Sequence, residues 1–312
     1  MIMKKILLSI VCLMMLGIQS VLAGTAQIVL RHQGNVKQFN PDELPSAIEA
    51  AENGDTILLS AGTFKYSASS IVTINKAITI IGVGANNSVI DNSVYIDIPN
   101  NPVLTAHLLD GVNITRELYI VKSAIGIKIR KCVIDKGISY NINSDPIYEM
   151  LIDRCDINNI GLNSVLRSLT VTNSKAQVLN AGYTPDAAVF SNCNVIIGNT
   201  ATNGTANFIN CYITTFYNAG NSIFTNCLAS VTWKNYTSAE NCYTYTPSET
   251  EVDEAEYFQQ QGWLGTDGTI VGMYGGTTPF TLEPNAPKVT DYTIGVDTKT
   301  RMLNVKMTLS AN

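Results

Sequence analysis

The chain has 312 residues, of which only 14% are charged, and its formal net charge is −5. No basic stripe is present, which argues against nucleic acid as a ligand. Low charge with abundant Asn, Thr, Ser and Tyr favours a surface that meets neutral or weakly charged polymers, although this composition also arises for structural reasons alone.

The first 23 residues are typical of a cleaved secretory signal peptide. Two lysines precede an apolar run from Ile6 to Leu16, and a small-residue cleavage signal ends at Ala23. No later stretch is long and apolar enough to span a membrane. We therefore expect an exported monomer that reaches the periplasm, the cell surface or the medium.

Residues 24–54 are expected to form a strand and a capping helix. Ala26–Leu30 has the alternation of a strand. Residues 40–51 predict a short helix, with Asn, Pro and acids at its start and Gly54 just after its end. Such a helix would cover the open end of a stacked-repeat fold, where exposed strand edges otherwise aggregate.

Residues 55–245 contain a recurring sequence pattern. An apolar residue comes first, then Asn or a basic residue, then Cys, and finally a second apolar residue or a small one. Clear copies of the pattern centre on Cys132, Cys155, Ser174, Cys193, Cys211, Cys227 and Cys242, and fainter copies centre on Ser93 and Val112. The intervals between centres run from 15 to 23 residues. A repeat of this length cannot bury its apolar face alone, so the units must stack.

The repeat predicts an all-β fold, a single-stranded right-handed parallel β-helix. Apolar residues alternate with polar ones, which is strand periodicity, and Asn marks a bend between two strands. The frame of a leucine-rich repeat is absent. We expect Asn173, Asn192, Asn210, Asn226 and Asn241 to form a ladder, with amides hydrogen-bonded along the column.

The six cysteines of the repeat are expected to point into the dry interior as small hydrophobic residues. An even number in an exported chain also permits disulfides. However, stacked coils would place neighbouring Cβ atoms about 4.8 Å apart, beyond the usual disulfide separation of about 3.8 Å. A column also spreads metal ligands along a line rather than around a point.

Two further segments follow the coils. Residues 246–287 form an acidic, then Gly-rich cap segment that includes a helix-favouring stretch from Ser248 to Gln261 and a turn at Asp267-Gly268. That turn is a possible Ca²⁺ ligand but more simply a plain turn. Residues 288–312 alternate like a β-hairpin, a C-terminal strand appendage that either packs against the last coil or acts as a sorting signal.

The segment Leu44–Phe64, with its GDTILLSAGTF sequence, resembles the opening of secreted proteins with the pectin-lyase-like fold. Ala77–Gly82 and Val89–Asp91 continue a pattern that is also similar to chondroitinase-B-like, alginate-lyase-like and pectate-lyase-like proteins. Residues 267–280 resemble the C-terminal part of secreted bacterial β-helix proteins of unknown function. The resemblance implies the right-handed β-helix fold, which hosts lyases, hydrolases, esterases and non-enzymes.

Most catalytic motifs of this fold are missing. The Gln-Asp-Thr and paired-aspartate stretches of pectin methylesterases and the Gly-His-Gly and Arg-Ile-Lys motifs of polygalacturonases do not occur, which argues against paired-carboxylate hydrolysis. A lyase needs a base and a cation to neutralise a uronate carboxylate. The candidates are Lys128, Arg130, Lys131 and Arg154, with Arg130 directly over Asp153 in a cross-coil ion pair as the alternative interpretation.

Two further groups are candidates for ligand binding. Asp135, Asp153 and Asp156 are the weak candidates for Ca²⁺, which requires six to eight oxygen ligands; otherwise no cofactor is expected. Aromatic rings for stacking on sugars are Tyr212, Trp233, Tyr236, Tyr243 and Tyr245, which are equally ordinary strand formers.

The sequence therefore predicts an exported protein that recognises or adheres to extracellular polysaccharide without catalysis. One alternative is a polysaccharide lyase that cleaves a uronate-containing glycan by β-elimination. A second alternative is a structural surface protein.

Overall fold

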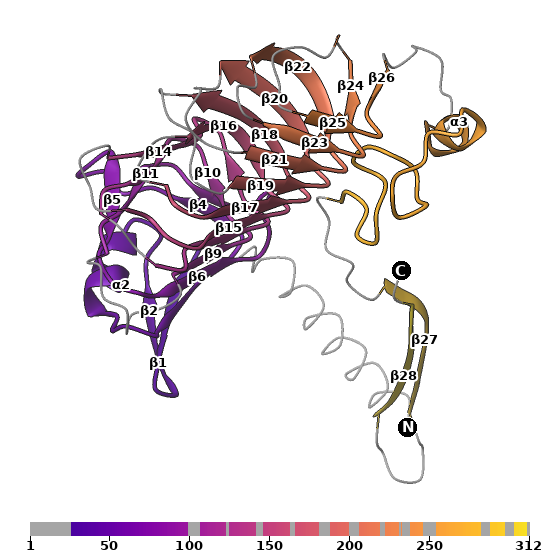
Figure 1. Cartoon of the computed structure of the whole chain (residues 1–312). Coiled ribbons are helices and arrows are strands. Elements are labelled where there is room, and N and C mark those ends of the chain that lie inside the picture. The colour runs from indigo at the N-terminus through magenta and orange to yellow at the C-terminus, as the bar shows by residue number, and fades with distance from the viewer. Residues whose placement is uncertain are drawn as a thin grey trace.

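Short strands of this chain stack in parallel into a β-solenoid, which Figure 1 shows as a computed structural model. The structure describes residues 26–98, 107–122, 125–141, 146–162, 166–180, 188–199, 206–218, 222–230, 232, 238–245, 254–281, 288–296 and 303–310. The parallel β-helix predicted from the repeat is thus confirmed, whereas the predicted signal peptide, residues 1–23, lies outside the described residues.

An antiparallel hairpin and a helix cap the N-terminal end. Strand β1 (Ile28–His32) pairs antiparallel with β2 (Asn35–Phe39) on one side and with β3 (Thr56–Leu59) on the other. Helix α2 (Leu44–Ala50) buries Leu44, Ala47 and Ile48. The expected strand and capping helix are present, but β2 was not expected.

The capping helix is shorter than the predicted range of 40–51. It begins at Leu44, and its first turn holds no acidic residue. Residues 40–43 form a turn instead, in which the Glu43 carboxylate accepts the Asn40 N–H at 2.7 Å. At the other end, the Lys76 ammonium donates to the carbonyls of Ile48 and Ala51, which replaces the missing intrahelical donors.

One strand of every coil belongs to a 12-stranded sheet, here called sheet A. Beyond the cap its members are all parallel, and each of them except the last, β25, contains a buried apolar residue. In order they are β3, β6 (Thr79–Gly82), β9 (Leu108–Asp110), β12 (Lys128–Arg130), β15 (Met150–Asp153), β17 (Leu169–Thr172), β19 (Ala188–Ser191), β21 (Ala206–Ile209), β23 (Ile223–Thr225) and β25 (Ser238–Glu240).

The strand that follows in each coil belongs to a 14-stranded sheet, here called sheet B. Its main path runs through β4 (Gly62–Phe64), β7 (Ser88–Ile90), β10 (Asn113–Ile114), β13 (Val133–Ile134), β16 (Asp156–Leu162), β18 (Lys175–Asn180), β20 (Asn194–Asn199), β22 (Tyr212–Asn218), β24 (Leu228–Ala229) and β26 (Tyr243–Thr244). A branch that joins at β16 contains β5 (Ile71–Ile74), β8 (Ser93–Ile96), β11 (Leu118–Ile120) and β14 (Ile138–Tyr140).

The observed register corrects one copy of the repeat. Val112 stands in the column of Cys132, as predicted, but the preceding position in that column is Ser88 rather than Ser93. Ser93 begins β8, after a different corner. The Asn before it, Asn92, does not bend the chain in the left-handed region, and its buried amide instead binds Tyr66. The sequence pattern alone cannot distinguish the two corners.

The bend between sheets A and B uses the left-handed backbone region in every coil from Gly111 onward. The bend residues have φ between 48° and 66°, and in order they are Gly111, Lys131, Arg154, Asn173, Asn192, Asn210, Asn226 and Asn241. Asn enters this region more readily than other residues with a side chain. The Asn of the repeat is therefore selected first for its backbone conformation.

The interior is a dry stack of apolar side chains. Phe190, Phe208 and Phe224 lie over one another with ring centroids 4.8 and 4.9 Å apart. Beside the bend, all six described cysteines are free thiols, and five of them are buried. Their predicted role as interior residues is confirmed. Burial raises the pKa of Cys193, Cys211 and other thiols in this column, so these groups are poor nucleophiles.

Helix α3 (Glu254–Gln260) confirms the helical stretch expected after the coils, and Figure 1 shows it beside the last strands of sheet B. The predicted hairpin is also present, as β27 (Lys288–Val296) paired antiparallel with β28 (Leu303–Ser310). It forms a sheet of its own and extends neither sheet A nor sheet B. No helix among the described residues has the length and apolar character needed to cross a bilayer.

Candidate functional site

The four basic residues proposed for a lyase lie around the bend at coils β12 and β15. Arg130 stands over Asp153 in the register, as predicted, and under Asp110 on its other side. Its guanidinium lies 4.0 Å from each of these carboxylates. Arg154 binds Asp153 at 2.7 Å. Both arginines are therefore paired with the protein's own acids, and a substrate carboxylate would have to displace those acids.

The remaining two candidates have different surroundings. Lys128 is exposed at the start of β12, while Lys131 occupies the bend with φ of 51°. Asp110, Arg130 and Asp153 form a column of alternating charge in which the arginine pairs with both acids. The Thr172 hydroxyl also donates a hydrogen bond of 2.8 Å to Asp153. The structure brings the basic cluster together but gives it the geometry of an ion-pair ladder.

The three aspartates proposed for Ca²⁺ do not form one site. Asp153 precedes the bend at Arg154 and lies on sheet A, whereas Asp156 follows that bend and lies on sheet B. Asp135 comes just after β13, one coil away. The bend turns the carboxylates toward different faces, and no group of three or more potential metal ligands occurs among the described residues. The prediction of a shared site is wrong for this reason.

The turn at Asp267-Gly268 has the simpler of its two predicted roles. The Asp267 carboxylate accepts the Thr269 N–H at 3.0 Å and the Thr269 hydroxyl at 2.8 Å. These bonds hold the pKa of the Asp267 carboxyl below its usual value. The side chain stabilises its own turn.

The predicted sugar-stacking tyrosines have unequal environments. Tyr243 stacks on Trp263 at 5.1 Å, and Tyr245 meets the edge of Phe258 at 4.8 Å. Both rings therefore pack against the chain's own C-terminal segment. Tyr212, in the same column as Tyr243, lines a pocket. Two further candidates, Trp233 and Tyr236, lie outside the described residues.

The C-terminal segment 263–276 runs back along the column of Asn bends. The Asn192 amide donates to the carbonyls of Met273 and Gly275 at 3.1 and 2.7 Å. The Asn226 carboxamide oxygen accepts the Thr266 N–H at 3.1 Å, and the Asn226 carbonyl accepts the Gly272 N–H at 2.8 Å. The segment thus crosses at least three coils, from Asn226 to Asn192.

Two glycines allow this close approach. A Cβ at Gly272 would lie 2.7 Å from the Leu228 side chain, and one at Gly276 would overlap the amide of Asn210. Both glycines also have positive φ, at 86° and 76°. The Gly-rich composition noted in the sequence is therefore a requirement of docking against the coils.

The Asn column differs from the predicted ladder. One contact between neighbouring amides is present, from Asn241 to Asn226 at 3.4 Å. The amide of Asn192 instead turns outward to the C-terminal segment, and the Asn226 oxygen does the same. The reason is that this segment offers backbone donors and acceptors at shorter distances than the adjacent coil does.

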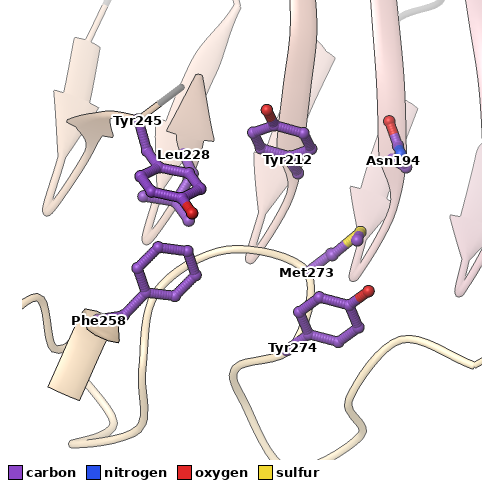
Figure 2. A pocket seen from close by; sticks show the side chains of 7 residues that line it. All are labelled: Asn194, Tyr212, Leu228, Tyr245, Phe258, Met273 and Tyr274. Carbon is purple, nitrogen blue, oxygen red and sulfur yellow. The ribbon is translucent and has the colours of Figure 1, made fainter. Parts of the chain in front are cut away.

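A pocket of about 160 Å³ lies between the outer face of sheet B and the C-terminal segment. Figure 2 shows its walls, with the sheet contributing one side and α3 and its following loop the other. The described residues that line it carry no charge: Asn194, Tyr212, Leu228, Tyr245, Phe258, Met273 and Tyr274.

A second, larger hollow of about 360 Å³ follows on the same face of sheet B. Polar residues alternate with apolar ones in its described lining: Asp156, Ile157, Asn158, Lys175, Ala176, Gln177, Asn194, Ile196 and Thr214. Asn194 lines both hollows, so the two are adjacent on this face. We call the combined feature the sheet B groove.

The register explains how the groove acquires its polarity. Asp156, Lys175 and Asn194 occupy the first outward position after the bend in successive coils, and Tyr212 follows in the next coil. Carboxylate and ammonium neighbour one another at the open end, and aromatic and apolar groups gather at the other. Such an arrangement can hydrogen-bond hydroxyl groups and stack against a ring.

The sequence did not identify Phe258, Met273 and Tyr274 as part of a pocket. The sequence feature that could have revealed them is the pair Gly272 and Gly276 among bulky residues. Such glycines indicate that the backbone packs closely against another part of the protein. Comparison with protein-family models, curated proteins and solved structures finds no match. The function therefore has to be inferred from the groove itself.

Proposed function

We propose that this protein binds extracellular polysaccharide in the sheet B groove and does not cleave it. The observation that carries the proposal is that two adjacent hollows share Asn194 and follow one column of outward residues, Asp156 to Tyr212, across neighbouring coils. A linear polymer needs a linear site, and the column that begins at Asp156 offers a polar side chain in each of three successive coils.

The dimensions suit a short run of sugar rings. From Asp156 to Tyr212 the path crosses three strand spacings of about 4.8 Å each, which gives roughly 14 Å or about three pyranose rings. Hydroxyl groups would meet the amides of Gln177 and Asn194, and a ring face would meet Tyr212. These are the contact types that bind neutral carbohydrate without a catalytic group.

The lyase alternative is less well supported. The described lining of the groove contains no basic pair available to act as base and carboxylate neutraliser, because the one cation in that lining, Lys175, neighbours Asp156. The basic residues at the other face, Arg130 and Arg154, are paired with acids. Recognition without β-elimination therefore accounts for more of the residues.

Two features of the sequence also support the proposal. The signal-peptide pattern of residues 1–23 would place the groove outside the cytoplasm, where polysaccharides are met. The resemblance of Leu44–Phe64 to pectin-lyase-like proteins is consistent with a scaffold used for glycans. Neither point identifies the polymer.

The test is affinity electrophoresis of the purified protein in gels containing laminarin, xylan, galactomannan, pectate or alginate. We expect retention by at least one of them, and about tenfold weaker retention after Tyr212→Ala. The matched control is Tyr119→Ala, which removes another half-buried tyrosine of sheet B that lies outside the groove.

Three outcomes would contradict the proposal. Equal loss in both variants would show that the tyrosine acts through stability, and absence of retention in all five gels would leave a structural surface protein. Release of unsaturated uronate from pectate or alginate, followed by ultraviolet absorbance, would establish the lyase.

A further inference from the structure

The sheet B groove is closed at one end. There Tyr245 meets the edge of Phe258 at 4.8 Å, and Leu228 and Phe258 are each only 2% exposed. Figure 2 shows Tyr245, Leu228 and Phe258 together at one side of the pocket, with Asn194 at the opposite side. A chain that enters past Asn194 would therefore reach a wall of apolar side chains.

The closing element is held firmly in place. Leu228, Phe258 and Val271 form a small buried core of their own, and Trp263 packs against it. The hydrogen bonds from Asn192 and Asn226 fix the backbone of residues 266–275 on the coils. The wall is thus a built part of the fold.

At the other end of the groove, the part of the chain that the structure describes provides no such cover. Asp156, Asn158 and Lys175 are exposed on the outer face of sheet B. Sheet B continues beyond them through β13 and β10, and Asp135 is exposed there too. A polymer can therefore leave the groove in this direction over the outer face of the sheet.

We infer that the groove recognises the end of a glycan chain, with a single terminal sugar in the closed pocket and the preceding sugars in the open hollow. This inference rests on the proposed function and adds to it the mode of binding. The closed pocket of about 160 Å³ is close in volume to a cavity that holds one benzene molecule, so it has room for at most one sugar ring and not for two.

The lining of the pocket also selects the terminal sugar. Its aromatic rings, among them Tyr212 and Tyr274, offer faces for the C–H surface of a pyranose, and Asn194 offers a donor and an acceptor for hydroxyl groups. Among the described residues of this lining, no charged side chain is present to pair with a carboxylate. Burial of an unpaired carboxylate is costly, so the terminal sugar is neutral and not a uronate.

The test compares each of the five polysaccharides intact and after partial acid hydrolysis, at equal mass, with fragments kept longer than the groove. End recognition predicts that retention per gram rises in proportion to the number of chain ends, because each new end is a new ligand. It also predicts that free glucose, xylose, mannose or galactose competes for the protein, and that glucuronate does not.

A variant of the pocket distinguishes recognition of a chain end from polysaccharide binding in general. Tyr274→Ala removes a side chain that is 40% exposed, so the fold should tolerate it, and we expect loss of competition by the monosaccharide with weaker retention. Retention per gram that is unchanged by hydrolysis would overturn end recognition while leaving polysaccharide binding intact. Absence of retention by every intact and hydrolysed polymer would overturn both.

Discussion

The coils from Asn173 onward repeat more regularly than the coils before it. In the earlier group the bends are Gly111, Lys131 and Arg154, and the column beside them changes from Ser88 to Val112 to Cys132. In the later group every bend is Asn, and the repeat interval falls smoothly from 19 to 15 residues. The regular coils are the ones on which another segment of the chain docks.

The comparison teaches that the repeated Asn performs two tasks at once. Its backbone accepts the left-handed bend, and its amide can then bind a segment that crosses the coils, as Asn192 binds Met273 and Gly275. Lys131 makes the same bend, but its side chain has no amide that could bind the backbone of a crossing segment. A uniform column thus turns the edge of a solenoid into a docking surface, and the groove depends on that surface for its closed wall.

The largest expected effect is a loss of stability when a core side chain is truncated, and it should differ between the two groups of coils. Phe208→Ala removes the middle ring of the stack between Phe190 and Phe224, and it should lower the free energy of unfolding by about 3–5 kcal/mol. Ile152→Ala, at the same column in the irregular coils, should cost less, within a range of about 2–5 kcal/mol. Urea unfolding measures both, and a larger loss for Ile152→Ala would contradict the comparison.

The next effect concerns His107, a buried residue of the irregular coils whose two ring nitrogens make no well-formed hydrogen bond with the described residues. Burial lowers its pKa to about 4, from 6.5 in the unfolded chain. Between these values the unfolded state binds a proton that the folded state does not, so stability falls as the pH falls through this window. The total loss should be about 3 kcal/mol at 1.36 kcal/mol per pKa unit.

His107→Gln provides the control for that titration. The variant should lose less stability than the natural protein between pH 7 and pH 4, because other groups titrate equally in both. Urea unfolding at several pH values measures the difference between the two curves. Parallel curves would mean that His107 is already protonated, or paired, in the folded state.

A smaller effect tests the docking role of the Asn column. Asn192→Ala loses two hydrogen bonds to the C-terminal segment and a residue suited to the left-handed region, for a cost of about 2–3 kcal/mol. Asn192→Gly keeps the backbone freedom and loses only the amide, so it should cost about half as much. If the two variants are equally stable, the bend conformation contributes nothing and this part of the account fails.

The smallest effect is a gain. Lys131 adopts φ of 51° at a position where the regular coils use Asn, so Lys131→Asn should raise the free energy of unfolding by about 1 kcal/mol. Lys131→Gln removes the same charge without relieving the backbone and should give no gain. A gain in both variants would assign the effect to charge.

The sequence predicted the repeating parts well and the docked parts poorly, for a physical reason. Cys132 and its equivalents reveal the coils because each must bury the same position against its neighbours. The contact of Asn192 with Gly275 spans 83 residues, and no periodic pattern marks it. Tyr243 and Tyr245 were expected to bind sugars, but their partners Trp263 and Phe258 lie in a segment whose position only the structure gives.

The corner at Ser93 shows a second limit. Alternating apolar residues surround both Ser88 and Ser93, so the pattern fits either place. The register depends on which strand pairs with which neighbour, and that is decided by the whole stack rather than by local sequence. The same dependence separated Asp153 from Asp156, which are close in sequence but lie on two sides of a bend.

Hydrogen–deuterium exchange with and without the polysaccharide that retains the protein most strongly tests the central claim directly. Binding in the sheet B groove should protect backbone amides in 175–178, 194–197 and 212–215, and leave 128–131 and 108–114 unchanged. Protection centred on Lys128–Lys131 and Arg154, with none along the groove, would contradict the account and return the basic cluster to the centre of the function.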